Sequence, residues 1–333
     1  MMVESFRAFL VNQTDARFTS GIRTLTLDDL PLGEVTIRVR YSSVNYKDGI
    51  CSLPNSRLVT QYPMVPGIDL AGEVIESQDT RFRSGDPVIV TSYDLGTGHF
   101  GGYSEIARVP ASWVVPLPEG LTLREAMILG TAGFTAALSL QRMEENGLRP
   151  DSGPVLVTGA TGGVGSTAVA MFSQLGYQVI ASTRKESEHA FLRELGANEI
   201  VSPDELVLRD GDSFANLPER FAGAVDPVAG KALPYILNTM KYGGCITVSG
   251  FTGGPELAAS VFPFLRRAIT FIGIDSVLCP MSIRAPLWQR IARELKPQKV
   301  LEHIVQEISL DQLPQTLERI LRGDMRGRAI VRL

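Results

Sequence analysis

The feature that most constrains the fold is a glycine-rich turn between an apolar strand and a helix. Residues 154–158 (PVLVT) read as a buried strand, and the turn GATGGVG follows at 159–165. Residues 162–176 (GGVGSTAVAMFSQLG), which begin within this turn, are predicted to form a helix, and 177–182 (YQVIAS) form a second apolar run. This order predicts a parallel βαβ unit, whose sheet needs helices over both faces because parallel strands are buried on both sides.

The same alternation continues along the middle of the chain. Further strands are predicted at 198–202, 221–228, 243–250 and 268–275, with helices at 186–196 and 231–241. Strands that alternate with helices of about ten residues indicate a doubly wound parallel sheet of the Rossmann type. Residues 126–279 are therefore predicted to form this α/β domain. A further helical stretch, LREAMILGTAGFTAALSLQRM, begins at 123 and crosses the start of the domain.

The first third of the chain has a different pattern. Short strands punctuated by glycine and proline are predicted at 34–44, within 66–77, at 88–90 and before Pro110. The tail from 280 adds two helices, 285–295 and 312–323, and two short apolar strands, 302–310 and 328–333. These strands resemble the first third more than the middle. We therefore expect a second, β-rich domain made of 1–125 and 280–333, with the α/β domain inserted into it.

Composition narrows the functional classes. Hydrophobic residues make up 44% of the chain and the net charge is −4, which suits a globular protein and gives no basic footprint for nucleic acid. No signal peptide or membrane-spanning run is predicted, so a cytoplasmic protein is expected. The three cysteines, Cys51, Cys245 and Cys279, have no metal-pair spacing and are expected to be reduced and buried.

The glycine turn is typical of a dinucleotide site, because its glycines permit the turn, the approach of a pyrophosphate and close helix packing. In sites for NAD an acidic residue near the end of the second strand accepts hydrogen bonds from the ribose 2′-hydroxyl. Here that strand is followed by Thr183, Arg184 and Lys185. Cations would attract a 2′-phosphate, so NADP(H) is the predicted cofactor; the alternative is a solvated basic helix start.

Several motifs together carry a resemblance over essentially the whole chain. They are SSVNYKDGI at 42–50, YPMVPGIDLAG at 62–72, GTAGFTAALSL at 130–140, VTGATGGVGSTAVA at 157–170, YGGCITVSG at 242–250 and GIDSV at 273–277. The chain resembles the zinc-independent medium-chain dehydrogenase/reductases, in their quinone oxidoreductase-like YhdH/YhfP branch, which includes acryloyl-CoA reductases. The resemblance implies a Rossmann domain joined to a GroES-like catalytic domain.

The zinc-dependent relatives place a Cys-His pair where this chain has Asn45-Tyr46-Lys47, and a His-Glu pair where it has Ile68-Asp69. A catalytic zinc needs three protein ligands, so the sequence predicts hydride transfer without a metal. The resemblance places Asn45, Tyr46 and Asp48 beside the nicotinamide as catalytic residues, with Tyr46 as a candidate hydrogen-bond or proton donor. The alternative is that Asn45 and Asp48 cap turns and Tyr46 packs its ring. Asp48 is expected to be ionised unless its site is dry, and so to orient a partner.

The resemblance also implies a set of cofactor contacts. They are Tyr46, Thr131, Thr135, Thr161, Gly162, Gly163, Val164, Thr183, Arg184, Lys185, Phe264, Ser276 and Arg328. Within this set, residues 161–164 are expected at the pyrophosphate, and Phe264, Ser276 and Arg328 at the nicotinamide end or the phosphates.

Three functions remain open. The leading one is an NADPH-dependent reductase of an α,β-unsaturated acyl-CoA, most simply acryloyl-CoA. The second is a reductase of quinones or small enones, and the third is a non-catalytic NADPH-binding sensor. The expected partner is a small-molecule substrate, with no nucleic acid and no membrane. The resemblance implies a homodimer that uses the late strands of the nucleotide domain.

Overall fold

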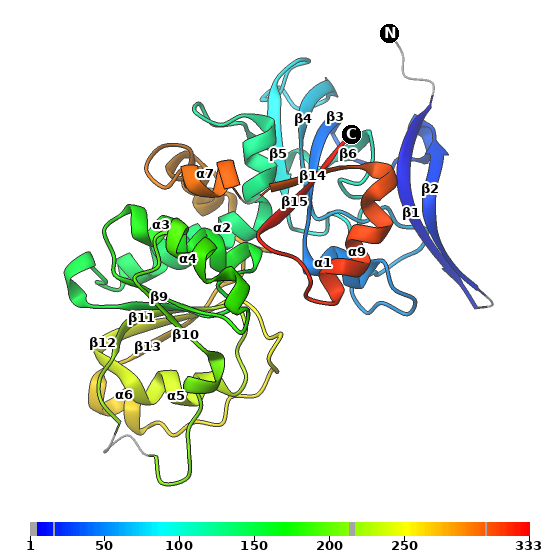
Figure 1. Cartoon of the computed structure of the whole chain (residues 1–333). Coiled ribbons are helices and arrows are strands. Elements are labelled where there is room, and N and C mark those ends of the chain that lie inside the picture. The colour runs from blue at the N-terminus through cyan, green and yellow to red at the C-terminus, as the bar shows by residue number, and fades with distance from the viewer. Residues whose placement is uncertain (1–4, 16, 213–216, 304) are drawn as a thin grey trace. The chain divides into compact units, whose positions relative to one another are not determined.

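The computed structural model describes residues 5–15, 17–212, 217–303 and 305–333. The chain divides into two compact units (Figure 1). Unit 1 comprises Met1–Thr131, Ser276–Arg293 and Ile304–Leu333, and unit 2 comprises Ala132–Asp275 and Glu294–His303. This division differs from the expected domain bounds at three segments. Residues 126–131 and 276–279 belong to unit 1, and residues 294–303 belong to unit 2.

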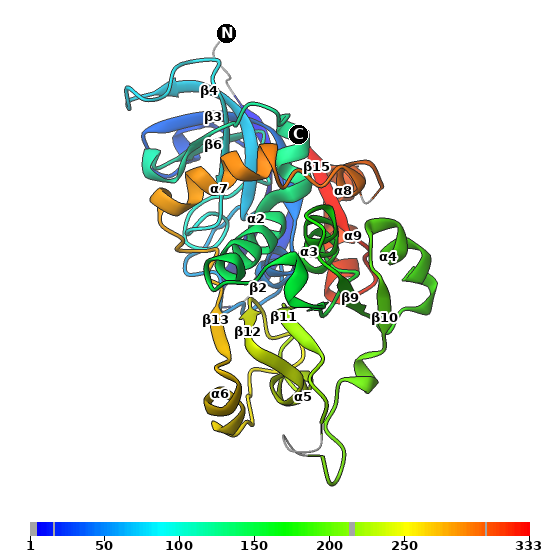
Figure 2. The same ribbon diagram turned by 90° about the vertical axis from the view of Figure 1, so that its left-hand side faces the viewer.

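Unit 2 contains the predicted doubly wound sheet. Its strands are β8 (Val155–Val157), β9 (Val179–Ser182), β10 (Glu199–Val201), β11 (Phe221–Asp226), β12 (Met240–Val248) and β13 (Thr270–Gly273). They are parallel and run in the order β10-β9-β8-β11-β12-β13, which is the Rossmann order. Figure 2 shows β13 beside β12 at one end of this order. The predicted fold class is thus confirmed for this unit.

Helices cover both faces of this sheet. They are α3 (Gly163–Gln174), α4 (His189–Leu195), α5 (Ala232–Thr239) and α6 (Phe262–Arg267). Figure 1 shows α3 and α4 over one face and α5 and α6 over the other. Two of the helices in unit 2, α6 and α8 (Gln298–His303), have no counterpart in the sequence prediction. The predicted strand at 302–310 accordingly begins later, because α8 extends to His303.

Unit 1 is built on a mixed sheet of short strands. These are β3 (Val35–Val44), β4 (Asp69–Ser77), β5 (Pro87–Thr91), β6 (Ile106–Val109), β7 (Val115–Pro116), β14 (Val305–Ser309) and β15 (Arg328–Arg332). The order is β14-β15-β3-β4-β5-β7, and β6 also pairs with β3. Because β15 pairs antiparallel with β3, the tail of the chain is part of the sheet formed by its first third.

Further elements of unit 1 surround that sheet. They are the hairpin of β1 (Phe6–Thr14) and β2 (Arg17–Leu25), and the helices α1 (Tyr46–Cys51), α7 (Met281–Arg293) and α9 (Leu313–Leu321). The sequence prediction did not include the hairpin. Figure 1 shows α1 beside α9, and Gly49 permits this approach, since a Cβ there would lie 2.9 Å from Cγ of Leu321.

The long helix α2 (Leu123–Glu145) is broken inside. Gly130 has φ +49° and ψ −153°, a conformation that a residue with a side chain rarely adopts. The break immediately precedes Thr131, the last residue of the first segment of unit 1. The predicted helical stretch is therefore two helices joined at one glycine.

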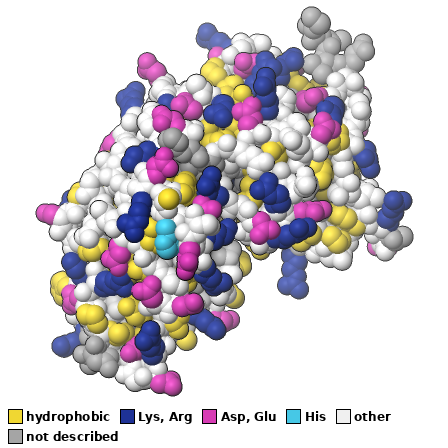
Figure 3. All heavy atoms as spheres, viewed as in Figure 1, with side chains coloured by type: hydrophobic (Ala, Val, Ile, Leu, Met, Phe, Trp, Pro, Cys, Tyr) yellow, Lys and Arg dark blue, Asp and Glu magenta, His cyan; other side chains and the backbone are white. Residues whose placement is uncertain are grey.

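Charge distribution, helix hydropathy and the cysteines can be compared with the expectations from composition. Lys, Arg, Asp and Glu are interspersed over the face shown in Figure 3, without a continuous basic stripe. In the part of the chain that the structure describes, none of the helices has the length and hydropathy needed to cross a bilayer. The three cysteines are free and buried, as predicted.

Candidate active site

The glycine turn lies at the carboxyl ends of β8 and β9 in unit 2. Gly162 is the N-cap of α3, and the turn is tied to β9 by a hydrogen bond from Ala160 N to Ser182 O (3.1 Å). Gly165 is required for packing, because a Cβ there would lie 2.3 Å from Gly159 O. At Gly162, which is exposed, the nearest atom to such a Cβ is Gly159 O at 3.4 Å. The helix start thus presents an open backbone, which is what an anion needs to reach its N–H groups.

The sheet supports this turn from the neighbouring strand β11. Asp226, its last residue, is fully buried and accepts hydrogen bonds from Thr158 Oγ1, Val228 N (2.9 Å) and Ala229 N (3.0 Å). One carboxylate therefore holds the ends of β8 and β11, the two strands at which the strand order reverses. In doubly wound sheets the ligand crevice lies at this point.

Residues 183–185 follow β9 and carry two basic side chains that reach the surface. Thr183 is buried and its Oγ1 accepts a hydrogen bond from Lys185 N (3.1 Å). Arg184 is exposed and Lys185 is half-buried. Since β8 and β9 are adjacent and parallel, this segment and the glycine turn lie at the same edge of the sheet. The predicted residues 161–164 and 183–185 are thus brought together within unit 2.

In unit 1, Asn45 and Asp48 form the start of helix α1. Asp48 Oδ2 accepts hydrogen bonds from Asn45 N (2.8 Å) and Asn45 Nδ2 (3.2 Å), and Asp48 Oδ1 accepts one from Ile68 N (2.9 Å). This arrangement is a capping box, in which N-cap and N3 residues satisfy each other's backbone groups. The capping interpretation of Asn45 and Asp48 therefore describes their geometry, and it does not exclude a chemical role for Asn45.

Asp69 forms the centre of the polar cluster. Its Oδ2 accepts hydrogen bonds from Ser43 Oγ, Asn45 Nδ2 (2.8 Å) and Thr131 N (3.0 Å), and its Oδ1 accepts one from Thr131 Oγ1 (2.5 Å). The residue is fully buried. A buried carboxylate needs such donors, because its desolvation is otherwise expensive.

Arg328 completes this cluster from β15. It is only 3% exposed, and it donates from Nε to Ile128 O (2.8 Å) and from Nη1 to Asn45 Oδ1 (3.0 Å). Its Nη2 is buried and has no hydrogen-bond partner among the residues that the structure describes. Arg328 was expected to contact the cofactor, and this stays a prediction; within unit 1 the residue supports the Asn45 side chain. We call Ser43, Asn45, Asp48, Asp69, Thr131 and Arg328 the polar cluster.

Asp48 is fully buried in this cluster, and its burial shifts its pKa. Burial raises the pKa of Asp48 above its ordinary value of 3.8, and the nearby Asp69 adds to the rise, while the hydrogen bonds from Ile68 and Asn45 oppose it; the resulting pKa is about 6. Burial likewise lowers the pKa of the Arg328 guanidinium. Because the pKa of Asp48 lies below 7, Asp48 stays mostly ionised at neutral pH, and its role in orienting a partner stays a prediction.

The remaining predicted residues have varied environments. Tyr46, the first residue of α1, is 47% exposed, so its ring is not packed into the core of unit 1. Thr135 is buried in α2, and Phe264 packs against the apolar core of unit 2. Ser276 is 9% exposed and its carbonyl accepts a hydrogen bond from Arg284 Nη2 (2.9 Å).

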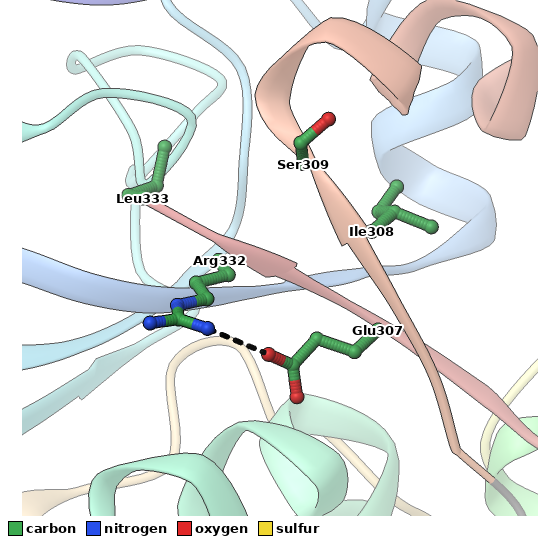
Figure 4. Close-up of a pocket in the computed structure, with 5 residues that line it drawn as sticks. All are labelled: Glu307, Ile308, Ser309, Arg332 and Leu333. Atoms are coloured by element: carbon green, nitrogen blue, oxygen red, sulfur yellow. Dashed lines mark ion pairs between the residues drawn. The ribbon is translucent and has the colours of Figure 1, made fainter.

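One surface hollow lies elsewhere in unit 1. Its lining residues are Glu307, Ile308, Ser309, Arg332 and Leu333, and Figure 4 shows Arg332 turned toward Glu307, with 3.9 Å between Nη1 and Oε1. None of the predicted site residues lines it. Within the described ranges, no group of three or more His, Cys, Asp or Glu side chains is placed to hold a metal ion.

Comparison with known families gives two matches. Residues 31–119 match the alcohol dehydrogenase GroES-like domain, and residues 163–293 match the zinc-binding dehydrogenase family. YhfP of Bacillus subtilis, which carries the name of a quinone oxidoreductase, is 49% identical over 98% of this chain and 99% of its own. Acrylyl-CoA reductase AcuI of Ruegeria pomeroyi is 46% identical over 98% of both chains.

Solved structures show the same relationship. The yhdH oxidoreductase of Salmonella enterica in complex with NADP superposes with a TM-score of 0.93 and is 41% identical, over 98% of this chain and 99% of that one. The B. subtilis protein yhfP with NAD bound gives 0.94 at 46% identity, over 99% of both chains. The chain therefore belongs to the medium-chain dehydrogenase/reductases, a family of oxidoreductases. Within that family it belongs to the quinone oxidoreductase-like branch that contains YhdH and YhfP.

Sequence analysis missed Asp69 and Ser43 as members of the site. A signal for Asp69 was present, because it is the one charged residue in the apolar segment VPGIDLAG and was therefore bound to be buried with partners. Ser43 gave no such signal, since a serine in a strand is ordinarily unremarkable. Its importance depends on the approach of Asp69 from the neighbouring strand.

Proposed function

We propose that the chain is an NADPH-dependent reductase of α,β-unsaturated acyl-CoA thioesters, of the acryloyl-CoA to propanoyl-CoA type, and that it works without a metal. The observation that carries the proposal is the polar cluster. At the positions where zinc-dependent relatives place their ligands, Asn45 and Asp69 are engaged in hydrogen bonds to each other and to Arg328 and Thr131. Asn45 and Asp69 therefore belong to a hydrogen-bond network at the positions where those relatives bind zinc.

The residues of unit 2 fit NADP(H). The open backbone at the start of α3 suits the pyrophosphate, and the exposed Arg184 with Lys185 suits a 2′-phosphate. Relatives support the assignment in part, since structures with 41% and 42% identity contain NADP or NADPH and one with 46% identity contains NAD. The choice between the two cofactors is assigned here to Arg184 and Lys185.

Bound NADPH supplies the hydride that reaches the β-carbon of the substrate. The electron pair of the double bond then moves to the thioester carbonyl as an enolate, which must be stabilised and protonated at the α-carbon. Tyr46 is the residue of the catalytic set that carries a hydroxyl, and its side chain is exposed on unit 1. We assign it the donation of a hydrogen bond or the proton, with Asn45 and Asp48 holding the first turn of α1 in place.

A reductase of quinones or small enones is the second candidate, because one relative carries the name of a quinone oxidoreductase. A panel of acceptors separates the candidates when NADPH oxidation is followed by absorbance. Rapid oxidation with acryloyl-CoA and none with quinones supports the first proposal. The reverse pattern supports the second, and tight NADPH binding without oxidation by any acceptor supports a sensor.

We also propose a homodimer that uses the late strands of unit 2. Strand β13 ends the strand order, and large apolar side chains in and around this region are exposed. They are Tyr242, Phe251, Val261, Phe262, Leu265 and Phe271. Such a surface is typical of an interface. Phe271→Asp is expected to shift the mass measured by sedimentation equilibrium from dimer to monomer, whereas a monomeric wild type would contradict the proposal.

A further inference from the structure

The break in α2 is held by two buried charged residues. In an unbroken helix, Thr131 N would donate to the carbonyl four residues earlier, and Ile128 O would accept from residue 132. Here Thr131 N donates to Asp69 Oδ2 (3.0 Å), and Ile128 O accepts from Arg328 Nε (2.8 Å). The Asp69 carboxylate thus accepts from the backbone N–H on one side of the break, and the Arg328 guanidinium donates to the backbone carbonyl on the other side.

Gly130 itself faces these groups. A Cβ at this position would lie 2.6 Å from Asp69 Oδ2 and 2.9 Å from Arg328 Nη2. Any side chain at Gly130 would therefore displace the groups that hold the break, in addition to being strained at φ +49°. The glycine is needed for the conformation and for the space.

The same two charged residues hold both ends of the Asn45 side chain. Asn45 Nδ2 donates to Asp69 Oδ2 (2.8 Å), while Asn45 Oδ1 accepts from Arg328 Nη1 (3.0 Å). Because a carboxylate only accepts and a guanidinium only donates, the orientation of the amide is fixed by its partners. The side chain of Asn45 and the backbone of the break thus share their two supports.

We infer that Asp69 and Arg328 are positioning residues that couple the Gly130 break in α2 to the Asn45 side chain. Asp69 acts through Asn45 and Thr131, and Arg328 acts through Asn45 and Ile128. The break immediately precedes the point at which the chain passes from unit 1 to unit 2. A change in α2 at Gly130 therefore changes the placement of Asn45. Removal of the charge of Asp69 or of Arg328 frees the break in α2 and the Asn45 side chain together. The effect on turnover rests on the proposed function, whereas the coupling itself does not.

The test combines a cycle of substitutions with two measurements. Asp69→Asn, Arg328→Gln and the double variant remove one or both charges; Asp69→Asn keeps the side-chain size, and Arg328→Gln shortens the side chain but leaves an amide donor. Turnover is measured with acryloyl-CoA, NADPH affinity by fluorescence titration, and amide hydrogen exchange of peptides covering 128–134 by mass spectrometry without cofactor. Arg267→Gln is the matched control, because Arg267 is also a buried arginine that donates to backbone carbonyls, those of Asn238 and Met240.

Each single variant is expected to lower turnover by at least about tenfold, with NADPH affinity changed less than threefold and with faster exchange at 128–134. The double variant is expected to be no slower than the slower single variant, because residues that act as one unit are not additive. The control is expected to lose thermal stability but to keep turnover and exchange at 128–134.

Multiplicative losses in the double variant, or unchanged exchange at 128–134 in either single variant, would overturn the inference. So would a loss of turnover in the control as large as that in Arg328→Gln. If wild type does not reduce any enoyl thioester, the proposed function fails, and the exchange measurement still decides the coupling. Gly130→Ala gives a second route, since it should produce the same fast exchange with both charges present.

Discussion

The glycine turn of unit 2 and the polar cluster of unit 1 differ in how they are built. The turn lies within one short segment and offers backbone N–H groups, whereas the cluster joins side chains from four separate segments around Asp69. The turn is open at Gly162, and the cluster is buried. We therefore expect substitutions beside the turn to change cofactor binding, and substitutions in or beside the cluster to change turnover.

The largest effect is expected at Tyr46. If its hydroxyl stabilises or protonates the enolate, Tyr46→Phe should lower turnover by about 10²-fold or more, the usual range for general acid catalysis. NADPH affinity should change little, because the ring remains. Single-turnover rates and cofactor titration of this variant test the separation, with Tyr41→Phe as the control on strand β3. Normal turnover with weaker NADPH binding would assign Tyr46 to the cofactor.

The converse effect is expected beside the turn. A charge-assisted hydrogen bond contributes roughly 1.5–3 kcal/mol, so replacing Arg184 and Lys185 by glutamine should raise the Michaelis constant for NADPH by about a hundredfold. The constant for NADH and the maximal rate should be nearly unchanged. Steady-state kinetics with both cofactors provides the measurement, and the exposed Arg193 on α4, changed to glutamine, provides the control. Equal use of both cofactors by wild type would contradict the assignment.

The burial of the cluster predicts a pH dependence of stability. The folded pKa of Asp48 is about 6, above its ordinary value of 3.8, so the folded protein binds more protons between these values. This residue therefore lowers the free energy of unfolding as pH rises from about 4 to 6, by up to roughly 3 kcal/mol. Urea denaturation of wild type and Asp48→Asn across this range provides the measurement. As pH increases, the free energy of unfolding of the variant should rise relative to that of wild type.

Asp29 offers a matched control for that experiment. It occupies the same place in the capping box of Thr26, but it is exposed, and hydrogen bonds from the backbone and side chain of Thr26 lower its pKa. Asp29→Asn should therefore give a pH dependence of the opposite sign, with stability lost as pH falls through the lowered pKa. If both substitutions give the same slope, the buried environment of Asp48 is not the cause.

The smallest expected effect is that of metal removal. Since Asn45 and Asp69 are engaged in the polar cluster, chelator-treated protein should contain no stoichiometric zinc and should keep its activity. Metal analysis together with an activity assay before and after chelation provides the test. A loss of activity that zinc restores would contradict the metal-free proposal.

The sequence was sufficient to predict the parts of the fold that depend on local pattern. The alternation of strands and helices from residue 154 and the glycine turn predicted the doubly wound sheet, and both are present in unit 2. The capping role of Asn45 and Asp48 was also within reach as an alternative, because a capping box lies within four residues. Each of these features depends on residues close together in the chain.

Other features depend on distant contacts and were missed. The break at Gly130 was not predicted, because a glycine inside a helical pattern is ordinarily tolerated, and the contacts of Asp69 and Arg328 with this break come from distant segments. The sequence also did not reveal that Ile128 and Asn45 would accept hydrogen bonds from the Arg328 guanidinium.

The most direct test of the proposed function follows the hydride into the product. Wild-type protein is incubated with acryloyl-CoA and NADPH carrying deuterium at the transferable position of C4, and the thioester product is examined by mass spectrometry and NMR. The proposal predicts propanoyl-CoA with one deuterium, located at the β-carbon, and a solvent-derived proton at the α-carbon. NADPH oxidation without a deuterium-labelled thioester, or deuterium at the α-carbon, would contradict it.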